Sequence, residues 1–165
     1  MITRMQLKEW AHYDGITGIF TWKKDRYRCR EGQTMGHLTG AGYIVIGLLG
    51  KLYYAHRLVF LYTKGTHPEQ VDHQNNNRSD NRISNLRAAT HQQNCFNKEK
   101  KGGKSSVYKG VCLHKRSGKW LAYIDIDNSR VHLGYFDDEL DAAMAYNKEA
   151  RTYYGKFAKL NVQAA

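Results

Sequence analysis

Four side chains within residues 71–97 combine a candidate base with candidate metal ligands. Asp72 and His73 are adjacent, Asn85 follows His73 by twelve positions, and Asn94 follows Asn85 by nine. A neutral imidazole is a suitable base near pH 7, so His73 can accept a proton from water. The oxygen atoms of Asp72 and Asn94 are hard ligands, which suit Mg²⁺ or Mn²⁺ far better than Zn²⁺. Together these groups suit phosphodiester hydrolysis, which needs an activated water and a shield for developing negative charge.

For these residues to meet, the chain around them must fold as a strand, a long loop, a strand and a helix. The segments "VDH" and "LRAA" are strand-like, and the polar run between them, which extends to Asn85, is typical of a loop. Thr90 followed by Gln93 is a capping-box pattern, which predicts a helix that begins near His91. Such a unit can bring the four side chains together.

Other polar residues of this stretch are open to two interpretations. His91 lies three residues before Asn94, on the same helix face, and either contacts a metal or phosphate or is simply exposed near the helix start. Asn97, one turn beyond Asn94, is expected to face solvent. Arg78 and Arg82 are candidate phosphate contacts, although a solvated charged loop is the ordinary alternative.

The segments before this stretch predict β structure with one helix. "GIFTW" alternates between apolar and polar residues and predicts a strand, and "GYIVIGLLGKLYYAH" predicts two strands around a turn near Gly50. The apolar segment "AHRLVFLYTKG" predicts a short helix that ends at Gly65. His56, at the start of this helix, is expected to be structural.

The pattern "DH…N-R-x-S-N-L-R…T…Q-N" resembles the HNH endonuclease family with the ββα-metal fold. It is most similar to the phage and intron-encoded branch, in which the last His is replaced by Asn, and the resemblance covers about residues 16–98. It implies that His73 is the general base and that the side-chain oxygen of Asn85 accepts the other ring N–H of His73. It also implies that Asp72 and Asn94 bind Mg²⁺ or Mn²⁺, one ion per active site.

The last third of the chain has a different character. Residues 98–105 are basic and rich in Gly, which predicts a flexible linker. Beyond them, "YKGVCLH", "KWLAYIDID" and "RVHLGYF" predict a three-stranded antiparallel sheet, and "DDELDAAMAYNKEARTYYG" predicts a helix. An apolar stripe on this helix is expected to pack on the sheet; its members are Leu140, Ala143, Tyr146, Ala150 and Tyr154.

These C-terminal segments resemble the AP2/ERF DNA-binding domain across about residues 106–161. The resemblance implies a sheet that lies in the major groove of double-stranded DNA. The candidate DNA contacts are Lys109, Arg116, Lys119 and Arg130. The chain departs from the plant pattern at Asp125, where Arg is usual, and at His132, where Trp is usual, so the resemblance implies DNA binding but no target sequence.

Composition agrees with a polyanionic partner. The formal net charge is +11 and the sequence pI is about 9.6, and neutralised phosphates release counterions. The scattered Cys29, Cys95 and Cys112 form no CxxC pair, which argues against a zinc finger and indicates reduced thiols. With no long apolar span and no export signal, we expect a cytoplasmic protein, not secreted and without a membrane partner, in a bacterial host cell if it is phage-encoded.

The sequence therefore predicts an α+β chain: an HNH module with a β-rich N-terminal region (1–97), a basic linker (98–105) and an AP2/ERF-like sheet and helix (106–165). The expected function is that of a strand-nicking DNA endonuclease of homing or phage type, monomeric and without an organic cofactor. One alternative is a non-catalytic DNA-binding transcriptional regulator that keeps a degenerate nuclease fold. Another is an RNA-binding or RNA-cleaving protein, which a sheet suited to the B-form major groove disfavours.

Overall fold

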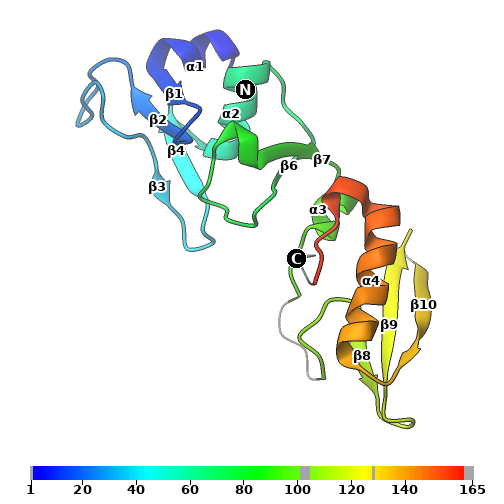
Figure 1. The fold of residues 1–165 in the computed structure, drawn as a ribbon. Coiled ribbons are helices and arrows are strands. Elements are labelled where there is room, and N and C mark those ends of the chain that lie inside the picture. Colours follow the sequence, from blue (N-terminus) through cyan, green and yellow to red (C-terminus); the bar gives the residue numbers. More distant parts are fainter. Residues whose placement is uncertain (1, 101–104, 128, 162–165) are drawn as a thin grey trace. The chain divides into compact units, whose positions relative to one another are not determined.

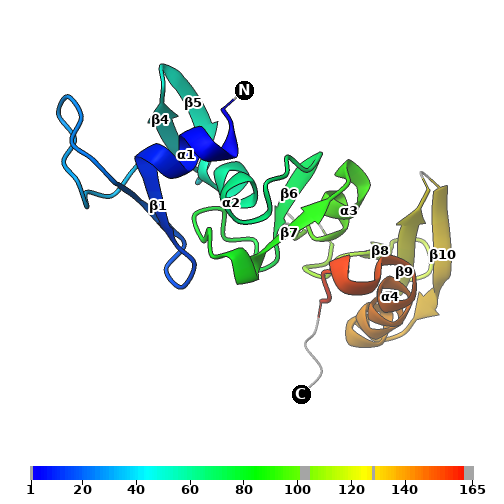
Figure 2. The same cartoon turned by 90° about the horizontal axis from the view of Figure 1, so that it is seen from above.

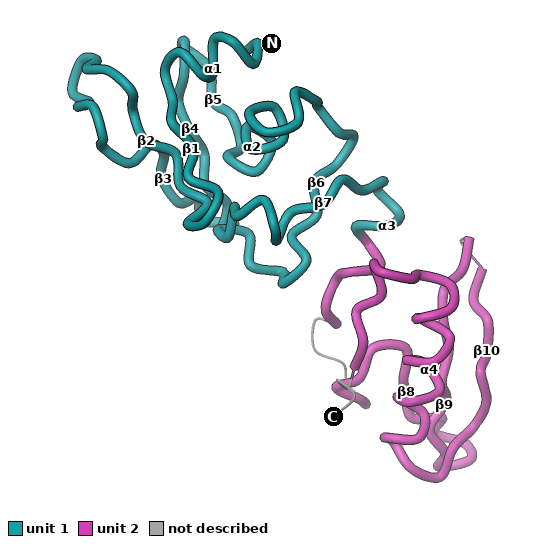
Figure 3. Tube along the Cα trace, turned by 45° about the horizontal axis from the view of Figure 1, so that its top comes forward, with its two compact units in different colours: residues 1–94 teal, residues 95–165 magenta. Residues whose placement is uncertain are grey.

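The computed structural model describes residues 2–100, 105–127 and 129–161. The chain is of mixed α and β structure, with several small antiparallel sheets (Figure 1). It divides into two compact units, Met1–Asn94 and Cys95–Ala165 (Figure 3). The linker predicted at 98–105 falls partly on residues 101–104, which lie outside the described residues.

Short elements succeed one another in the first unit, and the last of them continues to Phe96 in the second unit. In chain order they are α1 (Arg4–Trp10), β1 (Ala11–Asp14), β2 (Ile19–Trp22), β3 (His37–Leu38), β4 (Ile44–Leu48), β5 (Lys51–Tyr54), α2 (Ala55–Lys64), β6 (Gln70–His73), the 3₁₀ turn η1 (Ile83–Asn85), β7 (Leu86–Ala89) and α3 (His91–Phe96). β1 pairs with β2, β3–β4–β5 form a sheet, and β6 pairs with β7, all antiparallel. The strands and helices predicted for "GIFTW", residues 44–54, "AHRLVFLYTKG", "VDH" and "LRAA" are confirmed.

The sequence analysis missed α1 and β1. The signal for α1 was present, because Thr3 and Gln6 form a capping box: the side chain of Thr3 accepts from the backbone N–H of Gln6, and that of Gln6 accepts from the N–H of Thr3. α1 then packs against α2, which also contacts β4 and β5. The helix α2 ends where Gly65 takes the left-handed conformation, with φ at 72°.

The core of the first unit forms where α1, α2 and the N-terminal strands meet. Its most deeply buried members include Leu7, Phe20, Ile46, Leu48 and Val59. Burying one such side chain contributes roughly 1.5–3 kcal/mol. These contacts give β6 and β7 a packed support although the two strands are only four residues long each.

The second unit is a sheet covered on one face by a helix. Its elements are β8 (Val111–His114), β9 (Lys119–Ile126), β10 (Ser129–Phe136), α4 (Glu139–Tyr154) and η2 (Gly155–Phe157), with β9 central in the sheet. Two views, Figure 1 and Figure 2, show α4 lying along this sheet. Ala122 and Ile124 of β9 are buried against the alanine-rich face of α4, so this helix packs on the sheet as expected.

The predicted apolar stripe of α4 was wrong at one position. Leu140 is 47% exposed, whereas Ala142 and Asn147 are buried together with Ala143, Tyr146 and Ala150. Leu140 lies in the first turn of α4 and is not among the buried residues of this helix. The small alanines let α4 lie close to β9.

Gly110 marks the tightest of these approaches. Its φ is +71°, and a Cβ at this position would overlap the ring of Tyr146 and lie 2.5 Å from the carbonyl oxygen of Tyr123. Gly118, in the β8–β9 turn, also has a positive φ of +70°, but a Cβ there would meet nothing within 4 Å.

Gly110→Ala should therefore destabilise the second unit more than Gly118→Ala. Left-handed strain costs about 1 kcal/mol at either position, and overpacking against Tyr146 adds roughly 1–3 kcal/mol at Gly110 alone. Urea denaturation followed by the fluorescence of Trp120 measures both changes. Equal losses of unfolding free energy would contradict the close packing of α4 on β9.

His56 is a buried titratable group at the start of α2. It is 8% exposed, and its Nδ1 has no hydrogen-bond partner within the described part of the chain. Burial lowers the pKa of its imidazole to about 3, and the nearby charges of His73 and Arg57 act in the same direction. The folded protein therefore keeps this ring neutral at pH values where the unfolded chain protonates it.

Replacing His56 with Phe keeps an aromatic ring in place and removes this titration. Below the ordinary pKa of 6.5, His56 binds a proton in the unfolded chain but stays neutral in the folded chain. Acid therefore favours unfolding. Between pH 6.5 and pH 5 this group alone should cost wild type roughly 1.5 kcal/mol. Denaturation of both proteins at the two pH values tests this, and an equal acid loss in the variant would contradict it.

Candidate functional site

The strand β6 presents the candidate residues on two faces. Side chains alternate along a strand, so Gln70 and Asp72 point to one face and Val71 and His73 to the other. Asp72 is 3% exposed and His73 is 6% exposed, so both are buried. His73 is the last residue of the strand, where the chain enters the long loop.

The face that carries Asp72 also receives α3. The capping box predicted for Thr90 and Gln93 is present and starts this helix. Nδ2 of Asn94 donates to Oε1 of Gln70 at 2.7 Å, and Nε2 of Gln70 lies 3.0 Å from Nδ1 of His91. Because its nitrogen is committed to Gln70, Oδ1 of Asn94 is the atom left to act as an acceptor.

Gln70 connects β6 to α3 by hydrogen bonds, and the sequence analysis did not identify it. It holds both His91 and Asn94 from the strand position two residues before Asp72. His91 is exposed, and its contact with a metal or phosphate stays a prediction. Asn97 was expected to face solvent, but this was wrong: it is 3% exposed.

Asp72 forms an ion pair across the two strands. It is the direct partner of Arg87 in the β6–β7 register, and both Nε and Nη2 of Arg87 lie 2.7 Å from Oδ2 of Asp72. The Asp72 side chain is 4% exposed and that of Arg87 is 13% exposed. The guanidinium thus holds the carboxylate in place and offsets its charge.

The donor set fits a hard divalent cation. The carboxylate of Asp72 and the amide oxygen of Asn94 both belong to the face of β6 that α3 meets, and both are oxygen ligands of the kind that Mg²⁺ and Mn²⁺ prefer. Within the described ranges, no group of three or more His, Cys, Asp or Glu side chains gathers as a metal site. A metal at this position would therefore take most of its ligands from water and substrate.

His73 lies in an aromatic and amide environment on the other face. Its ring is 5.2 Å from that of His56 and 6.2 Å from that of Tyr43, measured between centroids. Nε2 of His73 lies 3.3 Å from Oδ1 of Asn81. Burial lowers the pKa of His73, and the hydrogen bond with Asn81 opposes this shift, so the imidazole is neutral near pH 7 and able to accept a proton.

Asn85 bonds the loop backbone. Its Oδ1 accepts from the N–H of Asn75 at 3.1 Å, and its Nδ2 donates to the carbonyl of Asp80 at 2.9 Å. It closes the loop that joins His73 to β7. Its expected contact with the imidazole stays a prediction, and Asn81, which the sequence analysis did not single out, is the amide bonded to Nε2 of His73.

The loop arginines are exposed, and each has a partner. Nη1 of Arg78 donates to the carbonyl of Ala41 at 3.0 Å, and its guanidinium lies 4.9 Å from the ring centroid of Tyr43. Arg82 binds both carboxylate oxygens of Asp80, at 2.8 and 2.6 Å. This pairing is the main reason why the pKa of Asp80 is lowered to about 2.

On the second unit, the predicted DNA contacts fall into two groups. Arg130 binds both oxygens of Asp125, at 2.9 and 3.1 Å, and lies 4.0 Å from the ring centroid of Tyr123. Lys119 pairs with Asp137 at 3.0 Å, and Arg116 is exposed in the β8–β9 turn. All three are open to solvent on or beside the sheet.

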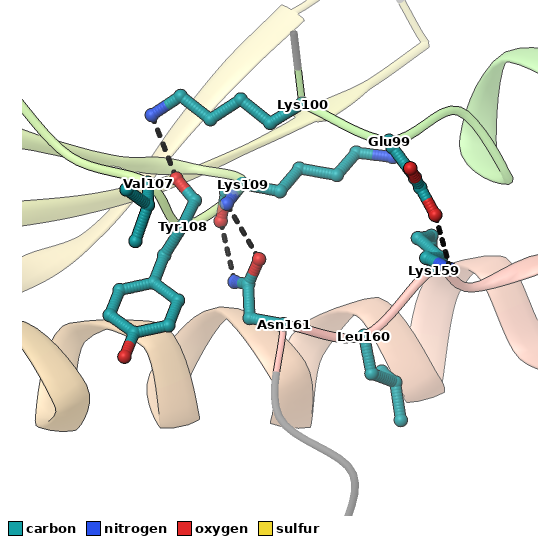
Figure 4. A pocket seen from close by; sticks show the side chains of 8 residues that line it. All are labelled: Glu99, Lys100, Val107, Tyr108, Lys109, Lys159, Leu160 and Asn161. Carbon is teal, nitrogen blue, oxygen red and sulfur yellow. Dashed lines mark hydrogen bonds and ion pairs between the residues drawn. The ribbon is translucent and has the colours of Figure 1, made fainter. Parts of the chain in front are cut away.

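Lys109 is placed differently from these three. It is half-buried beside a pocket of about 270 Å³ (Figure 4), and its Nζ donates to the carbonyls of Phe96 and Lys98 at 2.7 and 2.9 Å. Its backbone N–H and carbonyl both bond the side chain of Asn161. Burial lowers the pKa of Lys109 to about 8. The ammonium of Lys109 therefore stabilises the fold of the second unit by binding backbone carbonyls. Nothing in the local sequence predicted this role.

In the described part of the chain, no helix is long and apolar enough to cross a membrane.

Residues 53–95 match the family model described as HNH endonuclease. This range runs from β5 to α3 and includes Asp72, His73, Asn85 and Asn94. An uncharacterized HNH endonuclease of Acanthamoeba polyphaga mimivirus is 35% identical over 129 residues, which cover 76% of this chain and 65% of the viral protein.

Plant proteins match a shorter part of the chain. An AP2-like ethylene-responsive transcription factor of Arabidopsis thaliana is 40% identical over 58 residues, 35% of this chain and 12% of that protein. Dehydration-responsive element-binding protein 2D of the same plant is 45% identical over 60 residues, 35% of this chain and 29% of that protein. The chain thus spans less than two thirds of each of these relatives, including the viral one. Residues 53–95 are accordingly an HNH endonuclease domain, in a chain homologous to a mimivirus HNH endonuclease.

Proposed function

We propose that this chain is a metal-dependent DNA endonuclease that cuts one strand of a duplex. The observation that carries this proposal is the β6–loop–β7–α3 unit itself. It presents a buried neutral imidazole, His73, at the strand end, with Asp72 and Asn94 on the adjoining face. The unit lies within the range that matches the HNH endonuclease family.

His73 acts as the general base in this proposal. Its neutral ring takes a proton from a water molecule, and the resulting hydroxide attacks the phosphorus of the scissile phosphodiester. Burial keeps the ring uncharged before the reaction. Asn85 and the loop that it closes keep the strand end in position.

Asp72 and Asn94 are the proposed ligands of Mg²⁺ or Mn²⁺. Bound there, the metal would offset the negative charge that develops on the phosphate and the leaving oxygen. Arg87 occupies Oδ2 of Asp72 from the side, so Arg87 orients the carboxylate for this task. One such site handles one strand, so a monomer nicks, and double-strand cleavage needs two copies. A mobile or phage-borne genetic element is the setting that we propose.

The sheet of the second unit is the proposed targeting surface. Arg116, Lys119 and Arg130 are exposed on or beside it, and a net charge of +11 favours a polyanionic partner. The similarity to plant transcription factors supports duplex DNA as that partner. The same similarity favours a second candidate function, a DNA-binding regulator without catalysis, which the following cleavage test distinguishes.

With Mg²⁺ or Mn²⁺, wild type should convert supercoiled plasmid into nicked circle, and His73→Ala should lower the rate by about 10²- to 10⁴-fold because the base is lost. Asn94→Ala should raise the metal concentration needed for half-maximal cleavage. The control is His12→Ala, an exposed position on β1, which should cleave like wild type. If wild type forms no more nicked circle than His73→Ala on DNA from several sources, the non-catalytic function is favoured.

Arg116→Ala should weaken duplex binding, measured in the full chain carrying His73→Ala so that the DNA stays intact. Loss of one phosphate contact reduces the slope of log affinity against log salt concentration by about 0.9. Lys159→Ala removes the same charge from the side of the pocket in Figure 4 and should leave the slope nearly unchanged. Unchanged slopes for Arg116→Ala, Lys119→Ala and Arg130→Ala together would remove the sheet from the DNA interface.

A further inference from the structure

A buried amide beside the proposed base has no part in the mechanism as described so far. Asn81 is 2% exposed, and its Oδ1 lies 3.3 Å from Nε2 of His73, which is itself 6% exposed. Buried polar side chains within hydrogen-bond distance constrain each other, because burial limits their access to partners in solvent.

The orientation of the Asn81 amide is decided by its second contact. Nδ2 of Asn81 donates to the carbonyl of Ser79 at 3.2 Å. A carbonyl only accepts, so the nitrogen must face Ser79 and the oxygen must face His73. An amide oxygen in turn only accepts, so Nε2 of His73 must carry the proton of this hydrogen bond. In the neutral ring, Nδ1 is then the unprotonated nitrogen.

The backbone of Asn81 is held by the hairpin of β1 and β2. The hydroxyl of Tyr13 donates to the carbonyl of Asn81 at 2.8 Å, in a buried position. Tyr13 itself is fixed between Phe20 and Tyr62, with ring centroids 4.9 and 5.8 Å away. At Gly18, with φ at +75°, an added Cβ would lie 2.6 Å from the carbonyl carbon of Asn81.

The loop on either side of Asn81 is also anchored. Asp80 binds both Arg82 and Nδ2 of Asn75, the latter at 2.8 Å. Asn81 is therefore held at its backbone, its amide nitrogen and its neighbours, and its oxygen is aimed at His73. The imidazole of His73 can carry its proton on either ring nitrogen. A fixed hydrogen-bond partner is what selects one tautomer.

We propose that Asn81 is a positioning residue for the base: it fixes His73 as the Nε2–H tautomer, so that Nδ1 takes the proton from water, and the β1–β2 hairpin holds Asn81 for this task. The role as a positioning residue rests on the proposed function of His73. In this step water gives one proton to Nδ1, its hydroxide forms the new bond to phosphorus, and the bond from phosphorus to the leaving oxygen breaks. The leaving oxygen takes up a proton from solvent and Nδ1 returns its proton to solvent, while Asn81 accepts from Nε2–H throughout. The N-terminal hairpin thereby supports the proposed base through Asn81.

The tautomer is measured directly, without DNA. Two-bond ¹H–¹⁵N correlation spectra of ¹⁵N-labelled full chain distinguish a protonated Nε2 from a protonated Nδ1, and His73→Ala identifies the signals. Wild type and Asn81→Asp, which keeps an acceptor oxygen, should show the Nε2–H form. Asn81→Leu, similar in size but without an acceptor, should show a mixture. An Nδ1–H form in wild type would overturn the proposal, whatever the protein cleaves.

Cleavage kinetics separate positioning from folding. Asn81→Leu should lower kcat for nicking by about 10- to 100-fold, with KM changed by less than about twofold, and Asn81→Asp should recover much of the loss. Tyr13→Phe should lower kcat in the same way but less. Tyr62→Phe removes a hydroxyl from the same aromatic cluster, where no hydrogen bond to Asn81 is made, and should leave kcat unchanged.

The outcomes distinguish the two proposals. If wild type shows the Nε2–H form but nicks no DNA, the tautomer assignment stands and the endonuclease function fails. If wild type nicks DNA and Asn81→Leu does so at the same kcat, with its histidine spectra showing a folded protein, the positioning role of Asn81 fails. If Asn81→Leu is unfolded, the positioning role is tested by comparing kcat of Tyr13→Phe with kcat of Tyr62→Phe. Equal kcat values for these two variants overturn the proposal.

Discussion

The buried ion pair between Asp72 and Arg87 fixes β6 against β7, and both halves of the candidate site depend on that register. Taking two charges out of water costs several kcal/mol per ion, which only good geometry repays. A slip of one residue would turn Asp72 to the opposite face and leave both charges buried without a partner. The pair therefore selects one register for two short strands, which backbone hydrogen bonds alone specify weakly.

That register places the candidate residues on the two faces of β6, and neutral amides support each face. Gln70 holds Asn94 on the face of the proposed metal ligands, and Asn81 holds His73 on the face of the proposed base. Asparagine also accounts for the polar loop between β6 and β7. The backbone N–H and C=O groups of a loop have no neighbouring strand with which to form hydrogen bonds. Asparagine side chains meet this need; those bonded within the loop are Asn75, Asn77, Asn81 and Asn85. A stretch that looks like a solvated loop is therefore a hydrogen-bond network that positions His73, the proposed base.

Sequence patterns predicted the helices and strands that are determined by neighbouring residues. The apolar run of α2, the capping box of Thr90 and the alternation of β8, β9 and β10 all specify elements from neighbouring residues, and these elements are present. The partners of the site residues depend on distant contacts instead. Asn81 is held by Tyr13, 68 positions away, and no spacing rule within the loop points to that bond. For the same reason the burial of Asn97 and the exposure of Leu140 escaped prediction, because each depends on what another element covers.

The two exposed ion pairs near the sheet of the second unit bear on how this surface would meet DNA in the proposed function. Exposed pairs such as Arg130 with Asp125 contribute roughly 0–1 kcal/mol, so a phosphate competes for the guanidinium at little cost. Asp125 then stays behind on the central strand as an uncompensated negative charge beside the backbone of DNA. Binding that keeps the pair intact avoids this repulsion, and the stacking of Arg130 on Tyr123 favours the intact arrangement. Arg116, unlike Lys119 and Arg130, has no ion pair with a carboxylate within the described residues, so its charge is less hindered than theirs in reaching a phosphate.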